Sequence, residues 1–365
     1  MRWKILTAAV LVTAALTVPA AAATRLALPE PSGPYRVGET DLHLVDAARP
    51  DPWVAGPREL MVSVHYPALL VPGRAAPYML PGAAAHFDAV TANQYLGLGT
   101  PPGTDWAAVR THAVRDAPAL PGRRPVIVYS PGLGEPRTWG TAAAEDLASR
   151  GYVVVSADHT YEAPEVQFPD GSVRTMVEPG DPDPFLRKAL DVRVRDTRFV
   201  LDSLARLPWL TVDRVGMLGH SMGGAAAALT MAADPRVVAG VDLDGNLTYY
   251  DGSPMPPAAE GLAKPFLLVG KDGTTDTGPG WTAFLAHTPG WARQLKLLGS
   301  EHASFTDAEA LLPQLGVGVG TLDPATAIRT QRAYLAAFFD RWLRGGDGRL
   351  LDGPSSRYPA MAFVS

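Results

Sequence analysis

The stretch Gly219 to Gly224 reads Gly-His-Ser-Met-Gly-Gly and places Ser221 between small residues. An apolar run, Val215–Leu218, precedes it, and an alanine-rich segment that favours a helix follows it. Small residues let a strand and a helix approach closely while the serine backbone takes a strained turn, which is the setting of a nucleophile elbow. The same letters also suit a glycine-rich packing turn. The position between strand and helix favours Ser221 as a nucleophile.

A serine hydroxyl needs a base to remove its proton and an acid to orient that base. Where the nucleophile sits on such an elbow, the acid and then the histidine follow it along the chain, and only His287 and His302 come after Ser221. His302 follows a predicted strand, where a loop can direct it toward the elbow, whereas His287 lies at a predicted helix end. We therefore favour His302 as the base and interpret His220 as structural.

Three aspartates are candidates for the acid. Asp244 directly follows the buried run Val237–Leu243, and Asp272 and Asp276 follow the next predicted strand. Many hydrolases with such a nucleophile elbow place the acid after that later strand. Position alone therefore does not decide which of the three aspartates is the acid. Asp242 is expected to face elsewhere than Asp244 if the strand is regular.

Two backbone N–H groups are expected to stabilise the oxyanion. One belongs to the residue after the nucleophile, Met222, and the other to the loop after an earlier strand. That loop is Ser130–Gly134, Ser-Pro-Gly-Leu-Gly, in which Leu133 is the natural donor. An ordinary glycine turn would have the same composition.

The elements around these residues alternate between short apolar strands and helices, which indicates βα units and a mostly parallel sheet. A buried stripe of Leu335, Phe338, Phe339, Trp342 and Leu343 marks a last helix that ends at Gly345. The fold class is therefore α/β, a single-domain α/β-hydrolase fold with helices flanking the central sheet. The predicted strands cover 41–45, 59–67, 125–130, 152–158, 214–219, 237–243, 265–270 and 293–299. The predicted helices cover 141–150 and 184–207.

Composition limits the remaining possibilities. The chain has 365 residues, no cysteine and a formal net charge of -5. A nucleic-acid partner is not expected without a basic run, and cysteine nucleophiles and thiolate metal sites are excluded. Residues 1–23 resemble a secretory signal peptide with a short basic start, an apolar core and small residues at its end. We expect one domain over 24–365 and secretion. Within that domain, residues 24–124 are expected to hold the N-terminal strands and an irregular, pocket-shaping segment.

These motifs together resemble the platelet-activating factor acetylhydrolase family of the plasma type. Leu28 to Asp46, LPEPSGPYRVGETDLHLVD, is similar to the family's N-terminal signature. The runs SPGLGEPRTWGTAAAEDLASRGYVVVSADH, GHSMGGA, GVDLDGN and GSEHASFTD resemble its oxyanion loop, elbow, acid segment and histidine segment. The resemblance implies a nucleophile at Ser221, an acid at Asp244, a base at His302, and oxyanion donors at Leu133 and Met222.

The resemblance also implies a calcium-independent serine esterase without cofactor or metal, acting on short or oxidised sn-2 acyl groups of glycerophospholipids. Its partner is then a small-molecule or lipid ester, with transient contact to a lipid surface. One departure is Pro131, where the family usually has histidine. Alternatives are a broad carboxylesterase or cutinase-like polyester hydrolase, and an inactive hydrolase fold used for binding. Glu178, Asp181 and Asp183 lack the spacing of a calcium loop.

Overall fold

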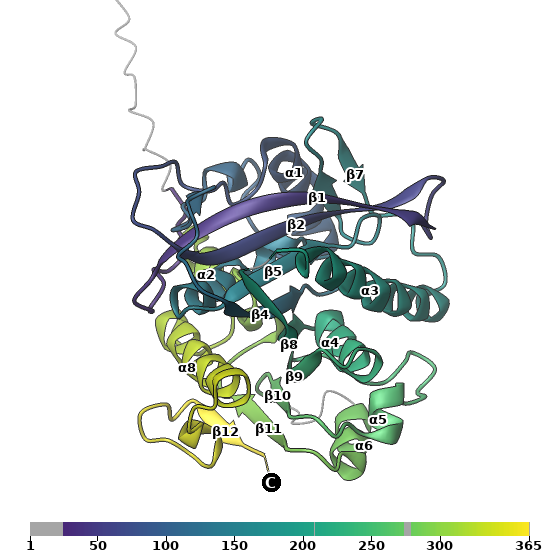
Figure 1. Ribbon diagram of the computed structural model, residues 1–365, viewed down its shortest axis with the longest axis vertical. Coiled ribbons are helices and arrows are strands. Elements are labelled where there is room, and N and C mark those ends of the chain that lie inside the picture. The colour runs from purple at the N-terminus through teal and green to yellow at the C-terminus, as the bar shows by residue number, and fades with distance from the viewer. Residues whose placement is uncertain (1–24, 208, 274–278, 365) are drawn as a thin grey trace, which may run out of the picture.

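A twisted sheet crosses the whole molecule (Figure 1). The computed structural model describes residues 25–207, 209–273 and 279–364. Within these ranges ten strands form one sheet in the order β12-β11-β10-β9-β8-β4-β5-β2-β1-β3. The strands are β1 (Arg36–Pro50), β2 (Pro57–Ala68), β3 (Val114–Arg115), β4 (Arg124–Ser130), β5 (Val153–Asp158), β8 (Leu210–His220), β9 (Val237–Leu243), β10 (Phe266–Gly270), β11 (Ala292–Leu297) and β12 (Met361–Phe363). A separate hairpin pairs β6 (Glu165–Gln167) with β7 (Val173–Thr175).

Helices cover both faces of this sheet. Figure 1 shows α2 and α8 on one side and α3 and α4 on the other. The α-helices are α1 (Pro81–His86), α2 (Thr141–Ser149), α3 (Pro182–Leu204), α4 (Met222–Ala233), α5 (Pro256–Glu260), α6 (Pro279–His287), α7 (Ala308–Leu311) and α8 (Pro324–Arg344). A π-helix, η1 (Phe87–Tyr95), follows α1. Short 3-10 helices are η2 (Trp106–Ala108), η3 (Arg137–Gly140), η4 (His302–Phe305), η5 (Leu312–Leu315) and η6 (Arg349–Leu351). In the described part of the chain, no helix combines the length and apolar character that a membrane crossing requires.

The centre of the sheet is parallel, and antiparallel pairs occur toward both ends, although the edge strand β3 is parallel to β1. Strand β4 pairs in parallel with β5 and β8, and the parallel ladder continues through β9 and β10 to β11. Strand β2 is antiparallel to both β1 and β5, and β12 is antiparallel to β11. Crossover helices bring all the parallel strands to one carboxyl edge, where ligand sites form in such sheets. The predicted α/β-hydrolase fold is confirmed.

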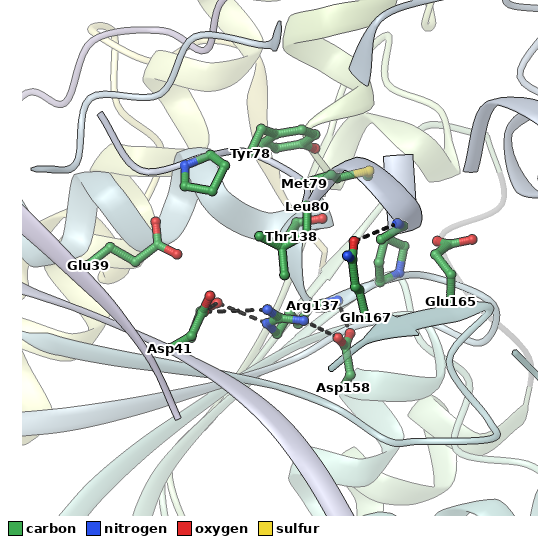
Figure 2. A pocket seen from close by; sticks show the side chains of 14 residues that line it. Glu39, Asp41, Tyr78, Met79, Leu80, Arg137, Thr138, Asp158, Glu165 and Gln167 are labelled. Carbon is green, nitrogen blue, oxygen red and sulfur yellow. Dashed lines mark hydrogen bonds and ion pairs between the residues drawn. The ribbon is translucent and has the colours of Figure 1, made fainter. Parts of the chain in front are cut away.

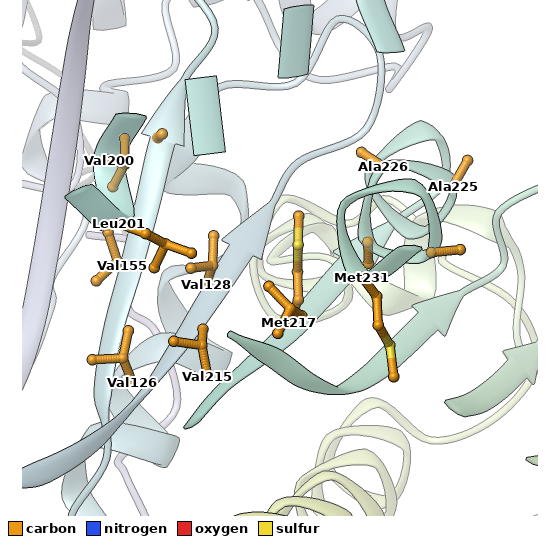
Figure 3. Packing of buried hydrophobic residues seen from close by; sticks show 14 of the residues in the cluster. Val126, Val128, Val155, Val200, Leu201, Val215, Met217, Ala225, Ala226 and Met231 are labelled. Carbon is orange, nitrogen blue, oxygen red and sulfur yellow. The ribbon is translucent and has the colours of Figure 1, made fainter. Parts of the chain in front are cut away.

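Alternation along the central strands builds a core on each face. Val126 and Val128 of β4 point to one face and pack with α3 and α4, as Figure 3 shows. Ile127 and Tyr129 point to the opposite face and pack with α2 and α8. Both sets are buried, because a parallel sheet covered on two faces has no solvent side. The two cores hold the carboxyl edge of the sheet rigid.

The irregular segment between β2 and β4 packs around a cluster of aromatic side chains. Phe87, Trp106 and Trp139 meet with ring centroids 4.9 to 6.0 Å apart, and all three side chains are buried. Trp139 belongs to η3, which follows the Ser130–Gly134 loop in the chain. This aromatic cluster therefore fixes the irregular segment beside the expected oxyanion loop.

Candidate active site

Ser221 sits on a strained turn between β8 and α4. Its φ of 53° and ψ of -124° lie outside the regions that a side-chain-bearing residue normally occupies. Two glycines make the turn sterically feasible. A Cβ on Gly219 would come within 2.0 Å of the Gly223 carbonyl, and a Cβ on Gly223 would come within 1.9 Å of Ser130 O. A nucleophile elbow requires a strained turn of this kind between a strand and a helix.

The structure pairs His302 with Asp244. His302 Nδ1 lies 2.6 Å from Asp244 Oδ2, while Asp244 Oδ1 accepts a hydrogen bond of 2.9 Å from Lys271 N–H. Asp244 is buried directly beyond β9, and His302 begins η4 with a half-exposed side chain. Both carboxylate oxygens of Asp244 therefore have partners, and this carboxylate fixes the orientation of the half-exposed His302 ring.

Several contacts place this pair beside the elbow. Ser221 N–H donates to Leu243 O at 2.9 Å, directly before Asp244. The rings of His220 and His302 have centroids 4.4 Å apart. Because β8 and β9 are adjacent parallel strands, their carboxyl ends bring Ser221 and Asp244 to the same edge of the sheet.

Two of the competing candidates, Asp272 and His287, have other partners. Asp272 accepts from Gly299 N–H at 2.7 Å and Gly273 N–H at 2.8 Å, so it joins the segment after β10 to the segment after β11. Asp276 lies outside the described residues. Nδ1 of His287 lies 2.9 Å from Ala258 O at the end of α6, in a packing role.

Asp242 is buried beneath the elbow. Its Oδ1 accepts from Gly245 N–H at 2.8 Å, and its Oδ2 accepts from Trp281 Nε1 at 3.2 Å. Burial raises its pKa to about 8. Asp242 faces elsewhere than Asp244, as expected, but regular alternation is not the reason, since residues two apart share a face of a strand. Asp244 leaves the regular strand with a φ of 55°, and its carboxylate contacts His302, whereas Asp242 accepts from Gly245 and Trp281.

The expected oxyanion donors occupy two backbone segments at this edge. Met222 is the first residue of α4, where a helix leaves backbone N–H groups without helical partners. Leu133 lies in the loop after β4, and Arg193 holds that loop by donating to Pro131 O and, at 3.0 Å, to Gly132 O. Their assignment as donors stays a prediction.

Three other charged groups near the loop were not singled out by the sequence. Arg193 is buried and pairs with Glu162 at 2.5 Å. Glu135 is buried, accepts Gly132 N–H at 2.6 Å and contacts His220. No periodicity or motif marks such side chains, because their partners are distant in the chain.

A polar pocket lies apart from the Ser221 turn. Figure 2 shows Arg137 joined to Asp41 and Asp158 within it. Arg137 and nearby hydrogen-bond donors hold the pKa of Asp41 at about 2, although burial acts to raise it. Ser221, Asp244 and His302 do not line this pocket.

His159 has a structural role, because its side chain is buried and its Nδ1 lies 2.9 Å from Asp196 Oδ2.

The segment with three acidic residues carries no recognisable metal site. Asp183 pairs with Arg187 at 2.7 Å, and Glu178 and Asp181 have exposed or half-exposed side chains. Among the described residues, no group of three or more His, Asp or Glu side chains is arranged to hold a metal ion. Asp183 lies in the first turn of α3, and Asp181 is the residue before that helix.

Comparison with known proteins identifies the family of the chain. Residues 20–167 match the family described as platelet-activating factor acetylhydrolase, isoform II. A probable 1-alkyl-2-acetylglycerophosphocholine esterase of Arthroderma benhamiae is 30% identical over 92% of this chain and 93% of its own. A platelet-activating factor acetylhydrolase of Canis lupus familiaris is 28% identical over 41% of this chain and 44% of its own.

A solved structure extends the comparison. The ferulic acid esterase from Streptomyces cinnamoneus superposes with a TM-score of 0.79 and is 39% identical, covering 93% of this chain and 100% of that one. Esterases thus match both the sequence and the fold. The chain is a carboxylic ester hydrolase and belongs to the platelet-activating factor acetylhydrolase family.

Proposed function

We propose that the chain is a secreted serine esterase that removes short or oxidised acyl groups, including sn-2 acyl groups of glycerophospholipids. Ser221 is the nucleophile, His302 the base and Asp244 the acid. The observation that carries this proposal is the 2.6 Å contact between His302 and Asp244 beside the strained Ser221 turn. The named relatives, an acetylglycerophosphocholine esterase and acetylhydrolases, support the substrate class.

The proposed reaction has two halves. Ser221 Oγ attacks the ester carbonyl carbon while His302 Nε2 takes the hydroxyl proton, and Asp244 stabilises the resulting imidazolium through Nδ1–H. The Leu133 and Met222 N–H groups donate to the oxyanion. Collapse breaks the ester C–O bond, and His302 gives its proton to the departing alcohol. Water, deprotonated by His302, then hydrolyses the acyl-enzyme and regenerates Ser221.

A hydrolysis panel tests the substrate. We expect p-nitrophenyl acetate and butyrate, and a phosphatidylcholine with a short sn-2 chain, to be turned over well above p-nitrophenyl palmitate. Ser221→Ala is the matched control for every substrate. Preference for long-chain triglyceride emulsions would contradict the proposal, and efficient release of soluble products from a polyester film would favour the polyester hydrolase.

A second candidate is an ester with an aromatic acyl group. The ferulic acid esterase is 39% identical to this chain, and Tyr95 and Tyr250 expose large aromatic surfaces near the loop. The Tyr95 ring lies against Gly134, because a Cβ there would come within 1.9 Å of it. Burial raises the pKa of Tyr95, and the charges of Glu162 and Tyr250 add to this effect.

Methyl ferulate separates the two candidates. An aromatic acyl site predicts that kcat/KM for methyl ferulate exceeds that for methyl butyrate, and that Tyr95→Ala removes this advantage without affecting the butyrate ester. An acetylhydrolase site predicts the reverse order of the two esters. Tyr35→Ala is a matched control, since Tyr35 is a similarly exposed tyrosine over which the guanidinium of Arg124 stacks.

Secretion is a separate part of the proposal. Residues 1–23 precede the described residues and have the composition of a signal peptide. Expression of the full chain in a secreting host should release protein into the medium with an N-terminus near Thr24, as read by mass spectrometry. Retention of Met1 on the exported protein would contradict cleavage at this position.

A further inference from the structure

His220 connects the three parts of the site. It directly precedes Ser221, and its side chain is buried. Its Nδ1 lies 3.0 Å from Glu135 Oε2, and its Nε2 lies 3.0 Å from the backbone oxygen of His302. The partners belong to the loop after β4 and to η4, so one ring contacts the expected oxyanion loop and the base segment together.

The two partners determine the protonation of the ring. A carbonyl oxygen can only accept, so Nε2 must carry a proton to bond His302 O. Glu135 Oε2 also accepts Gly132 N–H at 2.6 Å, which stabilises the ionised carboxylate. An ionised carboxylate requires a proton on Nδ1 as well. Both ring nitrogens therefore donate, and the ring is an imidazolium.

The titration of the two groups agrees with this geometry. Burial acts against both charged forms, but the Glu135 carboxylate raises the pKa of His220 above its ordinary value. The His220 charge and the Gly132 N–H in turn lower the pKa of Glu135. The other ionisable groups that face His220 are His302, Asp244 and Asp242.

We propose that His220 and Glu135 form a buried imidazolium–carboxylate pair that positions the Leu133 loop and the His302 segment around Ser221. The proposal rests on the proposed function, because it assigns Leu133 and His302 roles in ester hydrolysis. Glu135 holds the loop through Gly132 N–H, and His220 holds the base segment through His302 O. Neither residue need touch the substrate, so both are positioning residues.

If the pair only positions other groups, variants that break it should have a lower kcat but bind substrate as well as the wild type. Glu135→Ala removes the acceptor of Gly132 N–H and leaves the ring without its counter-charge. We expect kcat for p-nitrophenyl butyrate to fall about 10- to 100-fold, the scale of a small misplacement of reacting groups, with KM within about threefold of wild type. Glu135→Gln can accept from Gly132 and donate to a neutral His220, so it should recover most of the rate.

A coupled pair also predicts non-additive losses. His220→Leu should lower kcat to a similar extent, and the double variant with Glu135→Ala should be no slower than the worse single variant. Glu165→Ala is the matched control, because Glu165 is a buried carboxylate 2.8 Å from His86 and away from Ser221. The control should lose thermal stability but keep kcat within about threefold. Full additivity, or a folded Glu135→Ala with wild-type kcat, would overturn the proposal.

Ring-labelled NMR tests the pair without any substrate. The His220 signals, identified by their loss in His220→Gln, should show protons on both nitrogens at pH 7.5 in the wild-type protein. Because Glu135 raises the pKa of His220, Glu135→Gln should convert the ring to its neutral form at that pH. A neutral ring in the wild type would refute the pair even if the enzyme is an esterase. Failure of Ser221→Ala to lose activity would instead refute the proposed function.

Discussion

His302 Nδ1 and Asp244 Oδ2 lie 2.6 Å apart, although 58 positions separate the two residues in the chain. The other oxygen of Asp244 accepts Lys271 N–H from the end of β10. The carboxylate is thus held by two neighbouring strands while it orients the ring. Asp272 has other partners: its oxygens accept hydrogen bonds from the backbone N–H groups of Gly273 and Gly299.

The first prediction separates these two aspartates. Asp244→Asn should lower kcat by about 10³- to 10⁴-fold, because an amide cannot stabilise the imidazolium and favours the wrong tautomer. Asp272→Asn should stay within about tenfold of wild type. Steady-state kinetics with p-nitrophenyl butyrate, alongside thermal melts, measures both. The opposite ranking with unchanged melts would place the acid after β10.

The second prediction concerns the nucleophile. Ser221→Ala should lose covalent labelling by a fluorophosphonate, and its kcat should fall by about 10⁴-fold or more, because members of a triad act as a unit. Intact-mass analysis measures the labelling. Wild-type-like hydrolysis in this variant would remove Ser221 from the mechanism, and an unlabelled wild-type protein would indicate an inactive fold.

Much of the fold could be predicted because buried parallel strands are apolar along their whole length. The run Val237–Leu243 coincides with β9, and Pro125–Ser130 differs from β4 by one residue. Helix α8 ends where Gly345 adopts a left-handed conformation with φ 75°, as the stripe of large apolar residues predicted. In these elements the local pattern and the tertiary environment agree.

The segment from residue 68 to 124 could not be predicted for the opposite reason. Its helical turns are short, and an aromatic cluster involving Phe87 and Trp106 holds them in place. Such tertiary packing leaves no hydrophobic period in the sequence.

Part of the site could not be predicted either, because the partner of His220 lies 85 positions away at Glu135 and no local signal identifies it. Position alone also left the acid open among Asp244, Asp272 and Asp276.

The third prediction concerns the elbow's close packing. Gly219→Ala would place a Cβ within 2.0 Å of backbone atoms of Gly223, so strand and helix must separate. We expect a lower melting temperature and loss of fluorophosphonate labelling. Gly318→Ala is the matched control, because a Cβ there meets nothing within 4 Å. A labelled, active Gly219→Ala would show that the turn tolerates a larger separation.

The fourth prediction concerns metal ions. Serine, histidine and aspartate supply the whole proposed reaction, so esterase activity should be unchanged after dialysis against EDTA. The measurement is kcat/KM for p-nitrophenyl butyrate before and after treatment. Loss of activity that added calcium restores would contradict a metal-independent mechanism.

The last prediction concerns stability and pH. Burial raises the pKa of Asp242 from an ordinary 3.8 to about 8, so the folded protein keeps a proton that the unfolded chain releases. The stability that this group contributes is complete below about pH 4 and is lost as pH rises through about 8. Asp242→Asn cannot titrate, and its amide would oppose the Trp281 N–H.

The variant should therefore be less stable than wild type at pH 5, and the difference in the free energy of unfolding should shrink toward pH 9. Urea denaturation at pH 5, 7 and 9 measures it. Asp340→Asn is the control, since Asp340 has a half-exposed side chain on α8, far from the elbow in sequence; its difference from wild type should not follow this trend. A constant difference for Asp242→Asn at every pH would mean that Asp242 is already ionised beneath Ser221 in the folded protein.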